Sequence, residues 1–89
     1  MTRTFFLRIV TPFGEIFSER ATGLVLQGKS GAQTVLAGHA PLVATVEGGI
    51  CLVRAEGEKE RRASVGEGVL SVSAKEVLLV CERCVFEEK

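Results

Sequence analysis

The chain carries few side chains of the kinds that perform chemistry, and they are widely spaced along its 89 residues. Its single histidine, His39, could act as a general base only beside a nucleophile and an orienting acid. Ser30 lies in a glycine-flanked turn, but its neighbours do not form the Gly-x-Ser-x-Gly pattern of a nucleophile elbow. Aspartate is absent, so an orienting carboxylate would have to come from glutamate. The residues therefore predict no catalytic site.

The histidine stands in a tight corner, Gly38-His39-Ala40-Pro41-Leu42, between two strand-like segments. Gly38 permits a positive φ, while Pro41 fixes its own φ and favours an extended Ala40. Two interpretations of His39 remain besides catalysis. Its ring caps backbone groups of the corner, or it contacts a partner protein.

Three cysteines, Cys51, Cys81 and Cys84, are too few for an even disulfide framework. Cys81 and Cys84 have C-x-x-C spacing, but a zinc ion usually needs four ligands, and only Cys51 and His39 could supply the others. Residues three apart on a strand also point to opposite faces. Structural thiols are therefore the favoured interpretation, with a zinc site or redox chemistry as alternatives; we expect no metal and no cofactor.

Eleven basic and eleven acidic residues give a formal net charge of zero, which argues against a nucleic-acid-binding protein. The one dense charged run, residues 56–62, mixes both signs and is typical of a polar turn. No segment approaches the ~20 apolar residues of a transmembrane helix, so we expect no direct membrane insertion. The start of the chain is also too short and too broken by Arg8 to be a signal peptide.

Period-two alternation and β-branched residues dominate the chain, and they predict an all-β sandwich or barrel of short strands, with no helical crossovers. The predicted strands cover residues 5–10, 15–18, 24–27, 33–36, 42–46, 50–54, 61–65, 69–73 and 77–81. Residues 47–49 are predicted as a hairpin turn. The predicted inward positions are Leu7, Ile9, Val25, Val35, Val43, Leu52, Val65, Leu70, Val72, Leu78 and Val80.

Several motifs follow one another in a recognisable order along residues 5–84. They are Leu7-x-Ile9-Val10-Thr11-Pro12-x-Gly14, Val35-Leu36-x-Gly38-His39-Ala40-Pro41-Leu42, the Gly48-Gly49 turn, and Gly66-x-Gly68-Val69-Leu70-x-Val72. In this order they resemble the epsilon subunit of F-type ATP synthases. The Gly-His-Ala-Pro piece is the most specific part of the resemblance.

This resemblance implies a ten-stranded β-sandwich of two antiparallel sheets, forming one domain over residues 1–89 with a short tail at 85–89. It implies a non-catalytic rotor subunit that links the gamma subunit to the c-ring and couples proton translocation to ATP synthesis, with no small-molecule substrate. Such a subunit is peripheral at the cytoplasmic face of the inner cell membrane and soluble when isolated. The positions carried over to the gamma subunit are Leu36, His39, Leu42, Ala44 and Ile50, and those carried over to the c-ring are Lys29, Ser30, Gly31, Ala32 and Gln33.

The chain departs from the family pattern in three places. Ser30, Ala32, Gln33 and Thr34 stand where the ring-facing loop usually carries acidic residues and a glycine, and Ala37 replaces a frequent proline. The family's two C-terminal helices, which inhibit ATP hydrolysis and can bind ATP, have no counterpart before Lys89. A free-standing β-sandwich adaptor that binds another partner is the alternative interpretation.

Overall fold

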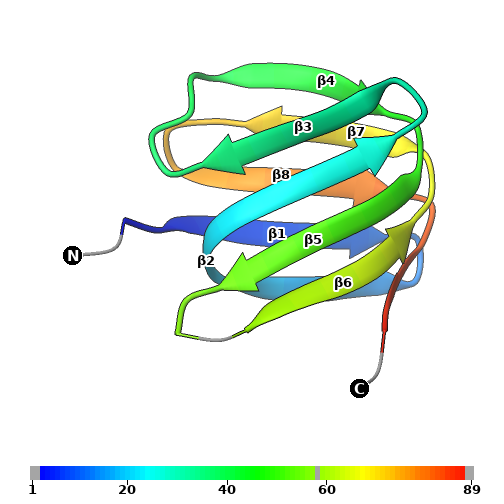
Figure 1. Cartoon of the computed structure of the whole chain (residues 1–89), viewed down its shortest axis with the longest axis horizontal. Helices are drawn as coiled ribbons and strands as arrows, with labels where there is room; N and C mark the ends of the chain where they lie inside the picture. Colours follow the sequence, from blue (N-terminus) through cyan, green and yellow to red (C-terminus); the bar gives the residue numbers. More distant parts are fainter. Residues whose placement is uncertain (1–2, 58, 88–89) are drawn as a thin grey trace.

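The computed structural model describes residues 3–57 and 59–87, and these residues form nine β-strands in one continuous, folded-over sheet (Figure 1). The strands are β1 (Phe5–Thr11), β2 (Gly14–Gly28), β3 (Gly31–Leu36), β4 (Leu42–Val46), β5 (Gly49–Ala55), β6 (Glu60–Val65), β7 (Gly68–Val72), β8 (Glu76–Cys81) and β9 (Cys84–Phe86). The predicted all-β class is confirmed.

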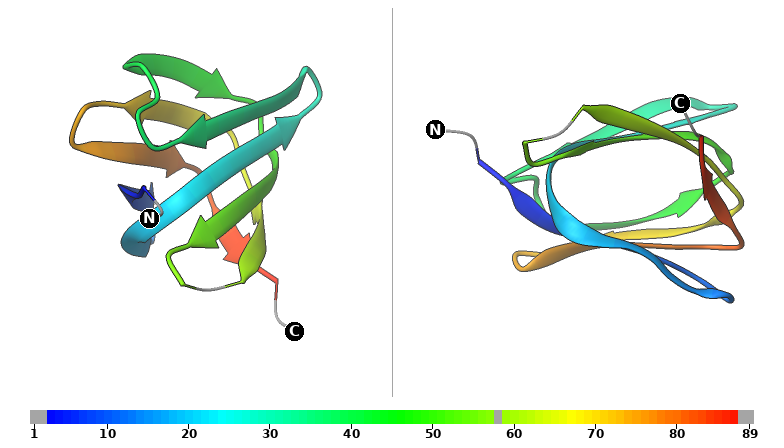
Figure 2. Two further views of the ribbon diagram at one scale, coloured as in Figure 1. Left: turned by 60° about the vertical axis from the view of Figure 1, so that its left-hand side comes forward. Right: turned by 90° about the horizontal axis from the view of Figure 1, so that it is seen from below.

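The sheet forms a sandwich because the long strand β2 belongs to both layers (Figure 2). Its first half pairs with β1, and its second half pairs with β3 and β5. The change occurs at a bulge beside Thr22, whose hydroxyl donates to the carbonyl of Arg54 at 3.2 Å. A bulge bends a strand and increases its twist, which lets β2 cross between the layers.

The first layer has the order β4-β7-β8-β1-β2, and the second has β3-β2-β5-β6-β9. The described residues form nine strands, and counting β2 once in each layer gives the ten expected from the resemblance. The sequence predicts two short strands, residues 15–18 and 24–27, where the structure has the single strand β2. Gly23 and the polar residues between 18 and 24 are typical of a strand end, but β2 continues through them.

Three local expectations need correction. Strands β1 and β8 pair in parallel, whereas only antiparallel neighbours were expected. Residues 47–49 do not close a hairpin: β4 pairs with β7 in one layer, and β5 pairs with β2 and β6 in the other. Val85 and Phe86, expected in a tail, belong to β9, where the ring of Phe86 lies 5.9 Å from that of Phe17.

The core lies between the layers and is formed by apolar residues from both. Its fully enclosed side chains include Leu7, Ile9, Leu24, Val35, Cys51, Val53, Leu70 and Leu79. Five predicted inward residues instead point to the outer sides or lie half-buried: Val25, Val43, Leu52, Leu78 and Val80. Each stands in an apolar run whose own residues do not distinguish the two faces, so that only polar residues beyond the run, or the pairing with other strands, indicate which side is inward.

Candidate interaction surfaces

The residues predicted to face the c-ring lie together at one end of the sandwich. Lys29 and Ser30 form the turn between β2 and β3, and Gly31 to Gln33 begin β3. β3 pairs along its full length with the second half of β2, from Gly31 opposite Gly28 to Leu36 opposite Gly23. The hairpin is therefore a rigid projection rather than a loose loop.

A carboxylate from the other layer holds this hairpin in place. Glu47 follows β4, and its Oε1 accepts the backbone N–H of Ser30 at 3.0 Å while its Oε2 accepts the Ser30 hydroxyl at 2.8 Å. These two hydrogen bonds lower the pKa of the Glu47 carboxyl below its usual value, the backbone bond having the larger effect and the hydroxyl bond the smaller. The positive charge of nearby Lys29 lowers it further. The contact therefore favours the ionised carboxylate and ties the hairpin to the β4–β5 connection.

Replacing Ser30 by alanine should remove the hydroxyl bond and raise the pKa of Glu47 toward its ordinary value of about 4.3. Because folding lowers this pKa, the contact stabilises the folded protein at pH values above the ordinary pKa of a glutamate. This contribution is lost as the pH falls through the lowered pKa of Glu47 in the folded protein. An NMR titration of the Glu47 side chain in both proteins measures the difference. Equal titration midpoints would show that the serine does not hold the carboxylate.

The residues predicted to face the gamma subunit do not form one surface. Leu36, 57% exposed, and His39 lie where β3 passes into β4, at the end of β3 opposite Ser30. Leu42 packs against the core, and Ala44 is half-buried on the same side of β4. Ile50 lines a cleft of about 290 Å³ between the β2–β3 hairpin and the β4–β5 connection.

His39 lies in the connection between β3 and β4, in the tight corner that the sequence predicts. Its backbone N–H donates to the carbonyl of Leu36 at 3.1 Å, and its ring Nδ1 lies 2.8 Å from the carbonyl oxygen of Ala40. The ring thus caps a backbone group. Ser30, the hydroxyl considered as a nucleophile, lies at the far end of β3, so the two side chains cannot act together.

All three cysteines are buried free thiols. Burial raises the pKa of Cys51 to about 12 and that of Cys84 to about 11, and it also raises the pKa of Cys81. A thiol held in its protonated form is a poor nucleophile and a poor metal ligand. In the part of the chain that the structure describes, no group of three or more histidine, cysteine or acidic side chains could hold a metal ion.

An exposed apolar surface that the sequence does not lead us to expect lies on the first layer. Val43 of β4, Val69 of β7 and Val80 of β8 are 74%, 43% and 44% exposed, and Val69 pairs directly with Val80. We call these residues the outer valine face. The sequence did hold a signal for it, because Thr45 shares the parity of Val43 and so marks that side of β4 as the outer one.

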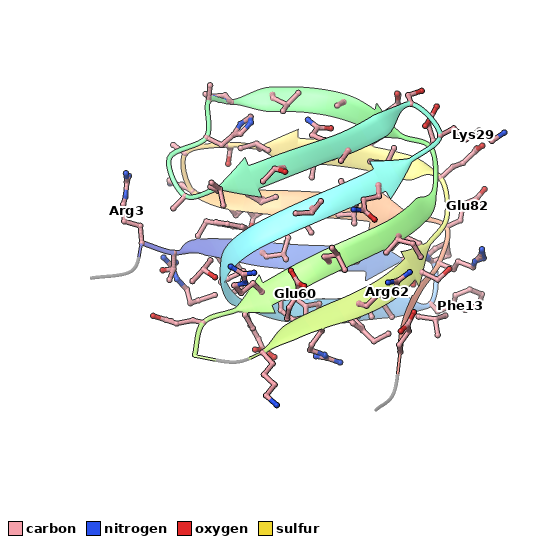
Figure 3. The ribbon with its side chains drawn as sticks, viewed as in Figure 1. Arg3, Phe13, Lys29, Glu60, Arg62 and Glu82 are labelled. Carbon is pink, nitrogen blue, oxygen red and sulfur yellow. The ribbon has the colours of Figure 1, made fainter. Side chains whose placement is uncertain are left out.

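Acidic residues border one end of the outer valine face. A shallow groove beside Val69 is lined by Glu47, Glu67 and Glu82, with Lys29 as its basic member. Figure 3 shows Lys29 and Glu82 at the same end of the molecule. Phe13, which is 87% exposed in the β1–β2 turn, lies at this end too.

Comparisons with known proteins agree with this architecture. Residues 4–87 match the family described as ATP synthase, Delta/Epsilon chain, beta-sandwich domain. An ATP synthase epsilon chain from Desulfitobacterium hafniense (strain Y51) is 35% identical over 89 residues, which is 100% of this chain and 67% of that protein. One from Bartonella henselae is 37% identical over 82 residues, 91% of this chain and 58% of that protein.

Two solved structures share the fold. A chain of the Euglena gracilis mitochondrial ATP synthase (OSCP/F1/c-ring) matches with a TM-score of 0.84 and 24% identity, covering 93% of this chain and 53% of that one. A chain of the Tetrahymena thermophila central stalk/c-ring structure matches with a TM-score of 0.74 and 10% identity, covering 93% and 66%. The expected resemblance is thus confirmed, and the adaptor alternative is not favoured. The chain belongs to the ATP synthase delta/epsilon family, of which it carries the β-sandwich domain.

Proposed function

We propose that this chain is a central-stalk rotor subunit of an F-type ATP synthase. In this role it links the gamma subunit to the c-ring and couples proton translocation to ATP synthesis without performing chemistry itself. The observation that carries the proposal is the family match over residues 4–87, together with the shared sandwich fold. The chain spans between 58% and 67% of the length of the two epsilon chains compared above.

The outer valine face is the surface that we assign to the gamma subunit. Val43, Val69 and Val80 stand on adjacent strands, and the burial of apolar area contributes ~25 cal/mol per Å². The neighbouring acidic groove would form the polar rim that surrounds the apolar centre of such a contact. With this assignment, two residues predicted from the sequence are no longer proposed as gamma contacts. Leu42 packs against the core, and Ile50 lies in the cleft beside the hairpin.

The edge of β4 extends this surface. β4 ends the strand order of its layer within the described residues, so the backbone beside Ala44 has no further strand to pair with. Leu36 and His39 lie at the end of the edge where β3 passes into β4, and they remain in the proposal as its margin. An open strand edge can add backbone hydrogen bonds to an apolar contact.

We assign the c-ring contact to the β2–β3 hairpin, residues Lys29 to Gln33. The hairpin projects from one end of the sandwich (Figure 1). The outer valine face lies on the outer side of the first layer. A body that touches a ring with its end and a shaft with its side can transmit rotation if it is stiff. The paired hairpin and the bond from Glu47 supply that stiffness. A subunit that contacts the c-ring in this way would be peripheral at the cytoplasmic face of the membrane. No described part of the chain forms a helix able to cross a membrane.

The test compares two valines with the same substitution. Val80→Glu places a charge in the proposed gamma contact, whereas Val85→Glu places it on β9 in the other layer, where Val85 is 61% exposed. Binding to the gamma subunit of the same enzyme, measured by calorimetry, should weaken about a hundredfold for V80E and less than about threefold for V85E. Circular dichroism checks that both variants fold. Equal affinity for V80E and the unmodified chain would refute the assignment.

A further inference from the structure

A second concave region lies at the end of the molecule away from the β2–β3 hairpin. It has a volume of about 500 Å³ and is enclosed by the start of β1, the β3–β4 connection and the β7–β8 turn. In Figure 3, Arg3 lies at this end and Lys29 at the opposite end. Its residues are Arg3, Thr4, Phe5, Arg20, Leu36 to Pro41 and Val72 to Val77. We call it the basic pocket.

More basic than acidic side chains line the basic pocket. Arg3, Arg20 and Lys75 supply cations, and among the described residues that line it only Glu76 supplies a carboxylate. Glu76 is itself within 3.8 Å of the guanidinium of Arg8, which lies outside the pocket. Cations gathered in one concavity raise the local concentration of anions, even where each alone would contribute little.

Arg20 is held in place by a neighbouring hydroxyl, and Arg3 lies against a glycine. Arg20 donates from Nε and Nη2 to the hydroxyl of Thr4 at 3.1 and 2.8 Å. The guanidinium of Arg3 lies against Gly38, where a Cβ atom would come within 3.1 Å of its Nη2. Gly38 has a φ of +86°, so this position both favours glycine and leaves room for the arginine.

Several backbone donors of the pocket are already engaged. The N–H of His39 donates to Leu36, and the N–H groups of Lys75 and Glu76 donate to the hydroxyl of Ser73 at 3.3 and 3.2 Å. A compact oxyanion such as phosphate is usually bound by converging backbone N–H groups. The pocket instead offers separated side-chain cations, which suit carboxylates spaced along a chain.

Apolar side chains complete the lining. Phe5 is partly buried against the core, Leu36 is exposed, and Val72 and Val77 form the pocket's inner wall beside the β7–β8 turn. We infer that the basic pocket binds an acidic polypeptide segment of a neighbouring protein, one in which carboxylates alternate with apolar residues. Charge complementarity selects the carboxylates, and the apolar wall receives the side chains between them. The opposite end of the molecule, bordered by Glu47, Glu67 and Glu82, would repel the same segment.

The experiment uses the whole chain and a synthetic peptide in which glutamates alternate with leucines. NMR titration should shift the amide signals of residues around the pocket, and the affinity should fall several-fold between about 50 and 200 mM salt. The double variant Arg3→Glu, Lys75→Glu should weaken binding at least about tenfold, because it reverses two exposed charges without touching the core. Lys29→Glu, the same reversal at the other end, should leave binding unchanged.

Three results would overturn the inference. A peptide with glutamine in place of glutamate could bind equally well, which would remove the role of charge. The double variant could bind like the unmodified chain, or Lys29→Glu could weaken binding as much, which would place the contact elsewhere. Inorganic pyrophosphate could displace the peptide at equal concentration while shifting the same amides, which would make this a site for small anions. None of these measurements uses the gamma subunit or the c-ring.

Discussion

Replacing Leu79 by alanine is expected to lower the free energy of unfolding by about 2–5 kcal/mol. Leu79 is 0% exposed and lies in the core on β8, between the parallel neighbour Ile9 and the antiparallel neighbour Leu70. Both neighbours are also fully enclosed, so little around the site can relax into the cavity that the substitution leaves. Chemical denaturation monitored by circular dichroism measures the loss.

The matched control is Leu78→Ala, the adjacent residue on the same strand. Leu78 is half-buried on the outer side of the first layer, so its loss should cost about 1 kcal/mol or less. The sequence predicts Leu78 in the core, but the register of β8 turns Leu79 inward instead. Equal losses for the two variants, or a larger one for Leu78, would mean that the strand faces the other way.

The strands themselves were predictable from sequence because their signals are local. Alternation in residues 5–10 and the charged turn at 56–62 locate β1 and the β5–β6 hairpin, and both agree with the structure. The faces of β5 and β8 are hard to predict, because Ile50 to Val53 and Val77 to Val80 are apolar throughout. Within such a run the two faces look alike, and only the polar residue at the strand end, Arg54 in β5 and Glu76 in β8, shares the parity of the outward residues. The pairing with distant strands settles which residues turn inward.

The interaction surfaces were less predictable than the fold, since a surface joins residues that are distant in the chain. The β2–β3 hairpin that we propose to face the c-ring is one continuous segment, so its residues are predicted together from the sequence and lie together in the structure. The partner of that hairpin, Glu47, comes from the opposite layer, and no local pattern connects it with Ser30. Val43, Val69 and Val80 become neighbours only through the order β4-β7-β8, which the sequence does not state.

Gly49→Ala is expected to be among the most damaging substitutions of a surface residue in this chain. Gly49 has a φ of +143°, which alone costs a residue with a side chain about 1–3 kcal/mol. In addition, a Cβ atom at this position would overlap the carbonyl oxygen of Gln27 on the paired strand β2. Relief of that overlap requires β5 to move away from β2 where the chain crosses between layers.

Gly14→Ala separates the two causes. Gly14 has a similar φ of +124°, but no atom lies within 4 Å of where its Cβ would stand. It should therefore show only the backbone cost, and G49A should exceed it by about 2 kcal/mol or should fail to fold. Parallel denaturation curves of the two variants measure the difference. If both lose the same stability, then the approach of β5 to β2 is looser than the structure describes, and the crossing between the layers does not depend on a bare backbone at Gly49.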